Sequence, residues 1–178
     1  LIDGDMITIG AMTTQHELVT NEALAKAAPL IREASLQIAD PQVRYMGTIG
    51  GNVANGDPAN DMPGLMQTLD ATYHLTGPEG SREVKARDFY EAAYFTARED
   101  EEILTAISFA KPSGGFAYEK QKRKIGDYAT AAAGVIITIE GGTCTAASVA
   151  LTNLSDTPVY CAAAVEALVG SSLDDATI

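Results

Sequence analysis

The stretch of residues 44–63 constrains this chain more than any other part of it. It contains four glycines, three asparagines and two aspartates, and apolar periodic segments flank it on both sides. Glycine permits positive φ angles and close approach of the backbone to a ligand, and successive free N–H groups form a concave anion site. This composition indicates a loop that wraps a polar, phosphorylated ligand. A long glycine- and asparagine-rich turn without a ligand is the competing interpretation.

The composition of the whole chain excludes other classes. Lys and Arg total 12 against 24 Asp and Glu, a net charge of −12, whereas a nucleic-acid binder needs a basic face. No segment reaches the roughly 18 consecutive apolar residues of a membrane span. Cys144 and Cys161 form no C-x-x-C pair that could hold an iron–sulfur cluster. We expect both cysteines to be reduced core residues of a cytoplasmic protein.

Apolar periodicity predicts an α+β fold in two parts. Strands are expected at residues 6–10, 71–76, 81–85, 102–109, 116–122, 132–139 and 144–151. Helices are expected after the capping box Thr14-x-x-Glu17, over 21–40 with an interruption at Pro29, and over 87–94. A helix over 62–69 is expected to have Asp61 or Met62 as cap and Pro63 in its first turn. A last helix is expected over 159–169, with Gly170 as its C′ residue.

Proline and glycine cluster at residues 111–115 without an apolar period, which favours a boundary there. The chain therefore divides into residues 1–112, a mixed sheet with helices, and residues 113–178, a smaller antiparallel sheet with a helix. Leu1 and its neighbours resemble the middle of a domain, and the chain stops where a new helix cap begins. We expect a fragment in which both parts are truncated.

Basic and aromatic residues after the boundary suggest a second ligand contact. In a strand, Lys120, Lys122 and Lys124 share one face and would attract an anion; a solvated edge strand guarded by lysines is the alternative. Tyr128 follows a Gly-Asp turn and could present its ring to a flat ligand, or it could be a half-buried core residue.

The remaining polar residues favour binding over metal or acid–base chemistry. Asp57 and Asp61 lie four residues apart among asparagines, so hydrogen bonds to ligand hydroxyls are better supported than paired acid–base catalysis. His16 and His74 have no partners at metal-binding spacing. The acidic run at residues 99–102 is interpreted as a solvated turn.

A family resemblance rests on the stretch of residues 48–52, Thr-Ile-Gly-Gly-Asn, followed by Asp57-Pro58 and residues 61–63. This pattern resembles the second flavin-binding loop of the molybdenum hydroxylases, in which a medium subunit or domain binds FAD. Further segments look like the same family: residues 77–80, 93–97, 102–107, 118–120 and 124–131. The combination of residues 9–15, 38–45 and 123–128 is similar to the medium subunits of aerobic carbon monoxide dehydrogenases.

The resemblance implies a role for each matching residue. Contacts to the pyrophosphate and the ribityl chain would come from Thr48, Ile49, Gly50, Gly51, Asn52, Asn55 and Asp57. Asp61 would bond the ribityl or ribose hydroxyls. Lys120 would lie at the pyrimidine end of the flavin, where its charge favours the reduced form, and Tyr128 would lie against the isoalloxazine ring. The family also has an A-G-G-x-S-L flavin loop, which this sequence lacks.

The resemblance further implies an electron-transfer subunit. Substrate chemistry would occur at molybdenum in a large subunit, and electrons would pass through iron–sulfur clusters of a small subunit to FAD here, then to a quinone, oxygen or a nicotinamide. Two alternatives stay open. A self-contained flavin oxidase of the two-loop FAD fold would need a substrate domain with a catalytic base; a nucleotide-binding interaction module would have no redox function.

Overall fold

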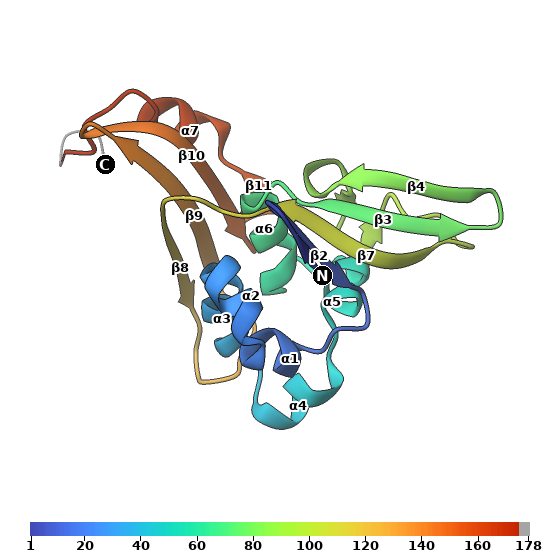
Figure 1. The fold of residues 1–178 in the computed structure, drawn as a ribbon. Helices are drawn as coiled ribbons and strands as arrows, with labels where there is room; N and C mark the ends of the chain where they lie inside the picture. Colours follow the sequence, from blue (N-terminus) through green and yellow to red (C-terminus); the bar gives the residue numbers. More distant parts are fainter. Residues whose placement is uncertain (175–178) are drawn as a thin grey trace.

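Two antiparallel sheets lie at an angle to each other, with short helices packed between and below them (Figure 1). The computed structural model describes residues 1–174. Its mixture of helices and sheets is the α+β architecture that the sequence predicts.

The first sheet has five strands in the order β1-β2-β7-β3-β4. These strands are β1 (Ile2–Asp3), β2 (Met6–Gly10), β7 (Ile103–Ala110), β3 (Thr72–Gly77) and β4 (Gly80–Lys85). Every pairing in it is antiparallel, where a mixed sheet was expected. The predicted hairpin at residues 77–80 is confirmed by the pairing of Gly77 with Gly80. Alternation places Tyr73 and Leu75 in the core, as the period of two requires.

Four short helices follow β2: α1 (Gln15–Thr20), α2 (Glu22–Ala27), α3 (Pro29–Leu36) and α4 (Pro41–Met46). Their ends follow the local chemistry of the sequence. Thr14 and Glu17 form the predicted capping box at α1, Asn21 caps α2, and Pro29 begins α3, which confirms the predicted interruption. Asp40 caps α4 by accepting the Val43 N–H at 2.9 Å.

The stretch of residues 44–63 is mostly helical, so the prediction of one long loop is wrong. It contains the end of α4, all of α5 (Ile49–Asn55) and the start of α6 (Asp61–Thr68). Thr48 caps α5 through a hydrogen bond from the Gly51 N–H at 3.0 Å. Only Gly56 among its glycines has a positive φ, 63°, and it ends α5. The N-cap of α6 is Asn60, not Asp61 or Met62, and Pro63 lies in the first turn as expected.

The helix predicted over residues 87–94 is also wrong. A 3₁₀ turn (Ala86–Asp88) leads into a small hairpin of β5 (Tyr90–Ala92) and β6 (Phe95–Thr96). Tyr94 has a φ of 61° at the tip of this hairpin, a conformation that no helix contains. The aromatic residues instead pack on one another, with Tyr73 and Phe89 ring centroids 4.7 Å apart.

The second sheet has the order β11-β10-β9-β8. Its strands are β8 (Gly115–Gln121), β9 (Ala131–Glu140), β10 (Thr143–Thr152) and β11 (Val159–Tyr160), and α7 (Ala162–Leu168) follows. The long hairpin of β9 and β10 is confirmed. The predicted helix over residues 159–169 is confirmed for its central part, while its first two residues form β11. Gly170 has a φ of 87° after α7.

Helix α6 connects the two sheets. It lies between them in Figure 1 and packs against β9, β10 and α5. Every residue of α6 is buried. Gly64 leaves room for the Thr152 side chain of β10, and Gly134 of β9 leaves room for Thr68. One hydrophobic core therefore includes side chains from both sheets, among them Tyr73 and Tyr118.

Candidate functional site

A cavity of about 280 Å³ opens beside the N-terminal end of α6. Four residues singled out from the sequence line it together: Asn52, Asp61, Lys120 and Tyr128. They come from α5, α6, β8 and the loop that joins β8 to β9. Tertiary packing therefore joins residues 52–61 with residues 120–128, as the resemblance implies. Further lining residues are Ile38, Ala39, Val43, Asn60, Gly126 and Asp127.

A buried ion pair forms the polar wall of the cavity. The Lys120 ammonium lies 2.8 Å from Asp61 Oδ2, and the two side chains are 1% and 4% exposed. The Tyr118 hydroxyl donates to the other carboxylate oxygen, Asp61 Oδ1, at 2.5 Å. Burial and the neighbouring Asp61 carboxylate raise the pKa of Tyr118, so its hydroxyl remains a donor. Both oxygens of Asp61 thus have a donor within the protein.

Gln37, at the end of α3, fixes the strand that carries the lysine. Its side-chain amide donates to the Tyr118 carbonyl at 3.3 Å, and its backbone carbonyl accepts from Lys120 Nζ at 3.3 Å. Its side-chain oxygen accepts from Lys122 Nζ at 3.3 Å. Lys120 and Lys122 both point to Gln37, but β8 ends at Gln121, so the predicted strand face with three lysines is wrong: Lys122 and Lys124 lie beyond the strand. β8 is an edge strand, yet Lys120 is buried and is not one of its solvated guards.

Two exposed tyrosines lie on this side of the molecule, and one of them, Tyr128, lines the cavity. Tyr128 is 63% exposed, which excludes a core role, and Tyr94 is 64% exposed. The Asp57 carboxylate, as a nearby charge and hydrogen-bond acceptor, raises the pKa of Tyr94, and Tyr128 adds to this shift. Asp57 also accepts the Ala59 N–H at 2.9 Å. Asp57, Tyr94 and Tyr128 therefore lie close together, on the outer side of the site.

The N–H groups of residues 47–52 were expected to be free for an anion, and this expectation is wrong. Each of the amides except that of Thr48 donates within the chain: Gly47 to Val43, Ile49 to Thr13, Gly50 to Ala11, Gly51 to the Thr48 hydroxyl and Asn52 to Thr48. Capping satisfies donors that a loop would have left open. The side chains and the outer surface of this segment remain as its possible ligand contacts.

Ile49 and Gly50 face the protein interior. Ile49 is 0% exposed. A Cβ atom at Gly50 would lie 2.5 Å from Ala11 Cβ and 2.7 Å from Ala11 O. The close approach that the sequence suggested at Gly50 is therefore an approach to the chain itself. Gly51 and Asn55 are exposed on the outer side of α5.

The sequence did not single out Tyr118, Gln37 or Tyr94 as site residues. Tyr118 carries a detectable signal, because residues two apart in a strand point to the same side, which places Tyr118 with Lys120. Gln37 had no such signal, since only the packing of α3 on β8 brings it to the lysines. Tyr94 depends on the hairpin of β5 and β6, where a helix was expected.

His16 lies in α1 and is half-buried, where a solvated residue was expected, and His74 lies in β3 against a neighbouring strand, as expected. His16 stacks on Tyr45 with centroids 4.0 Å apart, and His74 Nε2 lies 2.7 Å from Ser108 Oγ. Within residues 1–174 no three His, Cys, Asp or Glu side chains are placed to hold a metal ion. Cys144 and Cys161 are free thiols, as predicted; Cys144 is buried and Cys161 is half-buried.

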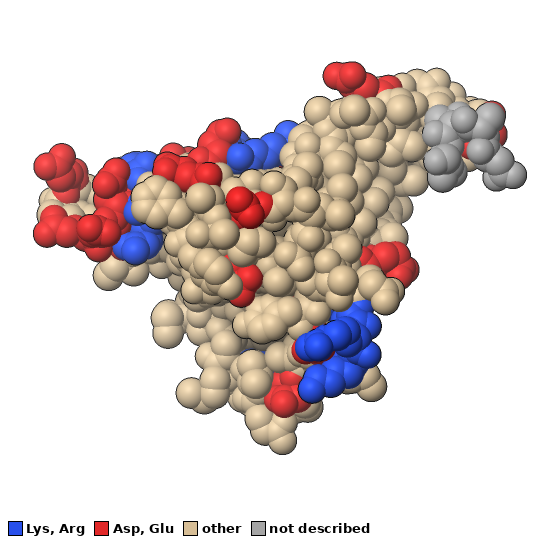
Figure 2. All heavy atoms as spheres, turned by 180° about the vertical axis from the view of Figure 1, so that it is seen from behind, with Lys and Arg blue, Asp and Glu red and all other residues tan. Residues whose placement is uncertain are grey.

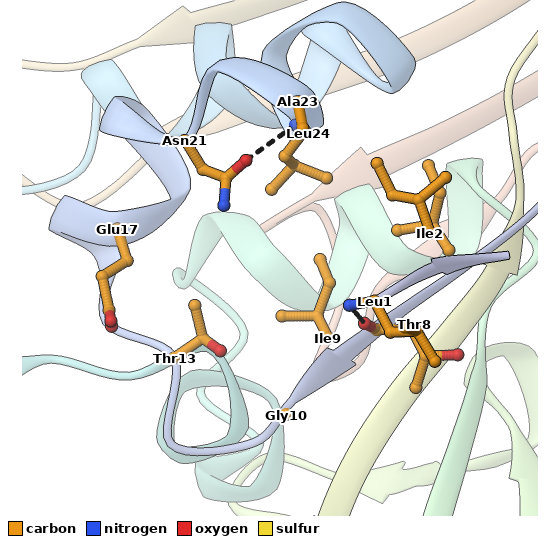
Figure 3. A pocket seen from close by; sticks show the side chains of 11 residues that line it. Leu1, Ile2, Thr8, Ile9, Gly10, Thr13, Glu17, Asn21, Ala23 and Leu24 are labelled. Carbon is orange, nitrogen blue, oxygen red and sulfur yellow. Dashed lines mark hydrogen bonds between the residues drawn. The ribbon is translucent and has the colours of Figure 1, made fainter.

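A second hollow, of about 330 Å³, lies between β2 and the helices α1 and α2 (Figure 3). Leu1, Ile9 and Leu24 supply apolar surface. Its one charged side chain is Glu17, which the capping box with Thr14 already occupies. This lining lacks the buried cation of the first cavity, so it is less suited to a charged, hydroxyl-rich ligand.

Charged residues are unevenly distributed over the face drawn in Figure 2. Figure 2 shows acidic residues gathered at the end of the molecule formed by the β3–β4 hairpin and the loop before β7, and a compact basic group at the β8–β9 loop. The acidic turn at residues 99–102 is not wholly solvated: Glu102 Oε1 lies 2.6 Å from Arg82 Nε and Oε2 lies 2.7 Å from Arg82 Nη2. The basic residues of this loop, Lys122, Arg123 and Lys124, precede Tyr128, which lines the cavity.

The first cavity fits one part of an FAD molecule. A buried ammonium, a carboxylate and two asparagine side chains can meet hydroxyl and carbonyl groups, and the exposed Tyr128 ring offers a flat apolar surface. The tight turn at Gly126, with a φ of 83°, passes against Ala39 and keeps this wall close. A dinucleotide is longer than this space, so only a portion of it can lie there.

Comparison with known proteins gives one consistent answer. Residues 2–112 match the family described as "FAD binding domain in molybdopterin dehydrogenase", and residues 116–178 match "CO dehydrogenase flavoprotein C-terminal domain". The carbon monoxide dehydrogenase medium chain of Afipia carboxidovorans is 62% identical over 174 residues, which are 97% of this chain and 60% of the relative.

Solved structures agree with the sequence relatives. Reconstituted CO dehydrogenase from Oligotropha carboxidovorans superposes with a TM-score of 0.96 and 60% identity, covering 98% of this chain and 62% of that one. Quinoline 2-oxidoreductase from Pseudomonas putida 86 gives a TM-score of 0.94 and 32% identity, covering 99% and 62%. The chain thus spans about three-fifths of the length of these relatives.

This chain belongs to the FAD-binding medium subunits of the molybdenum hydroxylases, a class of oxidoreductase subunits whose cofactor is FAD. Within that class, the highest identity quoted above, 62%, is to a carbon monoxide dehydrogenase medium chain. Among residues 1–174, no helix has the length and apolar character needed to cross a membrane.

Proposed function

We propose that this chain binds the flavin end of FAD at the cavity beside α6 and passes electrons from iron–sulfur clusters to an external acceptor. The observation that carries the proposal is the meeting of Asn52, Asp61, Lys120 and Tyr128 in one cavity. FAD supplies the two-electron chemistry when bound, and the protein positions and tunes it.

Each residue has a defined task in this proposal. Lys120 presents a cation toward the pyrimidine end, where negative charge develops on reduction. Asp61 retains lone pairs beyond its two bonds and can accept from a ribityl or ribose hydroxyl. Asn52 offers an amide beside it, and Tyr128 lies against the ring.

The outer side of α5 is the proposed path toward the pyrophosphate. Thr48, Gly51 and Asn55 are accessible there, and Asp57 lies at its end beside Tyr94. Because the amides are occupied, contacts here would come from side chains and from bound water. In this proposal Ile49 and Gly50 support the segment by packing and do not touch the cofactor.

The proposed assembly has three kinds of subunit. A small subunit would carry the iron–sulfur clusters, and a large subunit would carry molybdenum and oxidise the substrate. Similarity to medium chains of carbon monoxide dehydrogenase favours carbon monoxide as that substrate and a cytoplasmic assembly. The acceptor would be a quinone, including one at a membrane, oxygen or a nicotinamide.

A visible spectrum of the full-length protein tests the redox role. We expect flavin bands that bleach with carbon monoxide only when the small and large partners are present. Bleaching by substrate with this protein alone would favour a self-contained oxidase. Absence of flavin from the folded protein would favour a non-redox nucleotide-binding module.

The location of the flavin is tested by Tyr128→Ala. The side chain is exposed, so the fold should survive, whereas the absorbance and fluorescence of bound flavin should change. Tyr45→Ala is the matched control, because Tyr45 is 57% exposed and does not line the cavity. Equal spectra for Tyr128→Ala and the unmodified protein would place the ring elsewhere.

A further inference from the structure

Tyr118 reaches the cavity only through Asp61. It is 4% exposed, and it does not line the cavity, whereas Asp61 and Lys120 do. The carboxylate is bonded on one oxygen by Tyr118 and on the other by Lys120, at 2.5 and 2.8 Å. The orientation of the carboxylate is therefore set from both sides.

Thr152, at the end of β10, is 2% exposed and lies near the Tyr118 hydroxyl, where it lowers the pKa of the phenol against the larger effect of burial, which raises it. Gly64 of α6 keeps the space that the Thr152 hydroxyl occupies. Tyr118 and Thr152 are thus both buried beside Asp61.

The bond from Tyr118 changes the charge that the cavity presents. Lys120 and Asp61 together carry no net charge, and a donated hydrogen bond draws part of the negative charge on the carboxylate toward the phenol. In a buried place this matters more than at the surface, because little solvent screens it. Without the hydroxyl, Asp61 Oδ1 would present more negative charge to the cavity.

We propose that Tyr118 is a positioning residue of the flavin site: its hydroxyl holds and partly neutralises Asp61, so that Lys120 acts on the cofactor as a net cation. The inference rests on the proposed function, since it takes the cavity as the flavin site. The inference gives Tyr118 a role in tuning the midpoint potential of FAD, although Tyr118 does not line the cavity.

Redox titration of the full-length, FAD-loaded protein tests this, with variants Y118F, K120M and D61N. We expect Y118F to make the flavin midpoint potential more negative, because Asp61 then presents more negative charge to the cavity. K120M should shift the potential further in the same direction, and D61N should shift it to more positive values.

The double variant D61N/Y118F provides the sharper test. If Tyr118 acts through the charge of Asp61, then Y118F should change the potential much less in the D61N background. Tyr90→Phe is the matched control, because it removes a tyrosine hydroxyl 2.8 Å from Tyr73 Oη, away from the cavity. It should lower thermal stability without moving the potential.

Two results would overturn the inference. One of them leaves the proposed flavin site standing, and the other also contradicts the placement of Lys120 at the flavin. If K120M shifts the potential and Y118F does not, or Y118F shifts it equally in both backgrounds, Tyr118 is only a structural residue and the proposed flavin site stands. If neither K120M nor Y118F moves the potential, the placement of Lys120 at the flavin fails as well. Melting curves check that each variant is folded; should Y118F not fold, an unchanged potential in D61N overturns the inference.

Discussion

Gly50 has no room for a side chain. Its hydrogen-bonded N–H reaches Ala11 O at 2.8 Å, and α5 lies against the end of β2 at this point. Residue identity here is decided by the approach of two backbone segments and not by a ligand. A glycine inside a helix lowers its intrinsic stability, so the close packing explains why a glycine stands at this position.

We predict that Gly50→Val destabilises the folded chain by about 1–3 kcal/mol, as overpacking of a full site does. The expected observation is a lower midpoint in urea unfolding. Gly10→Ala is the control, since a Cβ there meets no atom closer than 3.9 Å. Equal midpoints for Gly50→Val and the unmodified chain would contradict the packing of α5 on Ala11.

Lys120 is the second residue whose removal should affect stability. Its ammonium is buried against Asp61, so Lys120→Met leaves a buried carboxylate without its cation, a change that costs about 3–5 kcal/mol in comparable pairs. Urea unfolding of the chain without cofactor measures it. The double variant Asp61→Asn/Lys120→Met should lose less than the sum of the single losses. Strict additivity would mean that the two side chains do not interact.

At the scale of elements, short-range patterns predicted the strands and their turns well. Alternation around residues 132–151 and the glycines at 141 and 142 are local signals, and the hairpin follows from them. The prediction of a loop over residues 44–63 failed because glycine content does not reveal what the backbone approaches. At Gly50 the neighbour is Ala11 of the same chain. For residues 87–94, the packing of Phe89 on Tyr73 decided against a helix, and that contact is not visible in a local window.

The candidate site shows the same division. Residue spacing and family resemblance brought forward Asp61, Lys120 and Tyr128, and the structure places them in one cavity. The ion pair between Asp61 and Lys120 could not be predicted, because it depends on how α6 meets β8. The expectation of free amides failed for a related reason. The N–H groups of Ile49 and Gly50 donate to the carbonyls of Thr13 and Ala11, which lie in an earlier segment of the chain.

The contact between β4 and the loop before β7 predicts a pH dependence. Two bonds from Arg82, the Glu99 N–H and nearby Arg98 hold the pKa of Glu102 at about 2, below its usual 4.5. The fold therefore favours the ionised form; this contribution to stability is present above pH 4.5 and is lost as the pH falls toward 2.

In a plot of melting temperature against pH, the acid limb is the fall in melting temperature between pH 4.5 and 2. Glu102→Gln should flatten this limb. Glu101→Gln, on the same turn, is the control and should leave the acid limb in place. An acid limb that stays unchanged in Glu102→Gln would show that the Arg82 pair does not contribute to it. The Arg82 side chain is 42% exposed, so added salt should weaken the effect.

For the whole molecule, the shared helix α6 is the decisive feature. Its buried residues belong to one core with side chains of both sheets. Domains joined by a small polar contact can unfold separately, but here the buried apolar side chains of α6 and of both sheets form one continuous core. We therefore expect the two sheets to unfold together.

Hydrogen exchange tests this cooperativity. Amides of β7 and of β9 should open with the same free energy, and Gly64→Ala, whose new methyl group would meet the Thr152 hydroxyl, should lower both together. Gly80→Ser is unsuitable as a control because its φ is 118°; Gly115→Ala, with nothing closer than 3.6 Å, is suitable. A fall in β9 alone would indicate separate units.

The bonding of Asp61 also has a consequence for synthesis. Its partners Tyr118 and Lys120 lie 57 and 59 residues further along the chain. At about 5–20 residues per second, the ribosome adds them roughly 3–12 s after the aspartate. During that interval the carboxylate has neither partner, and burying it unpaired is unfavourable. The N-terminal end of α6 is therefore expected to remain hydrated until β8 has been made, so the cavity is completed only after the ribosome has added that strand.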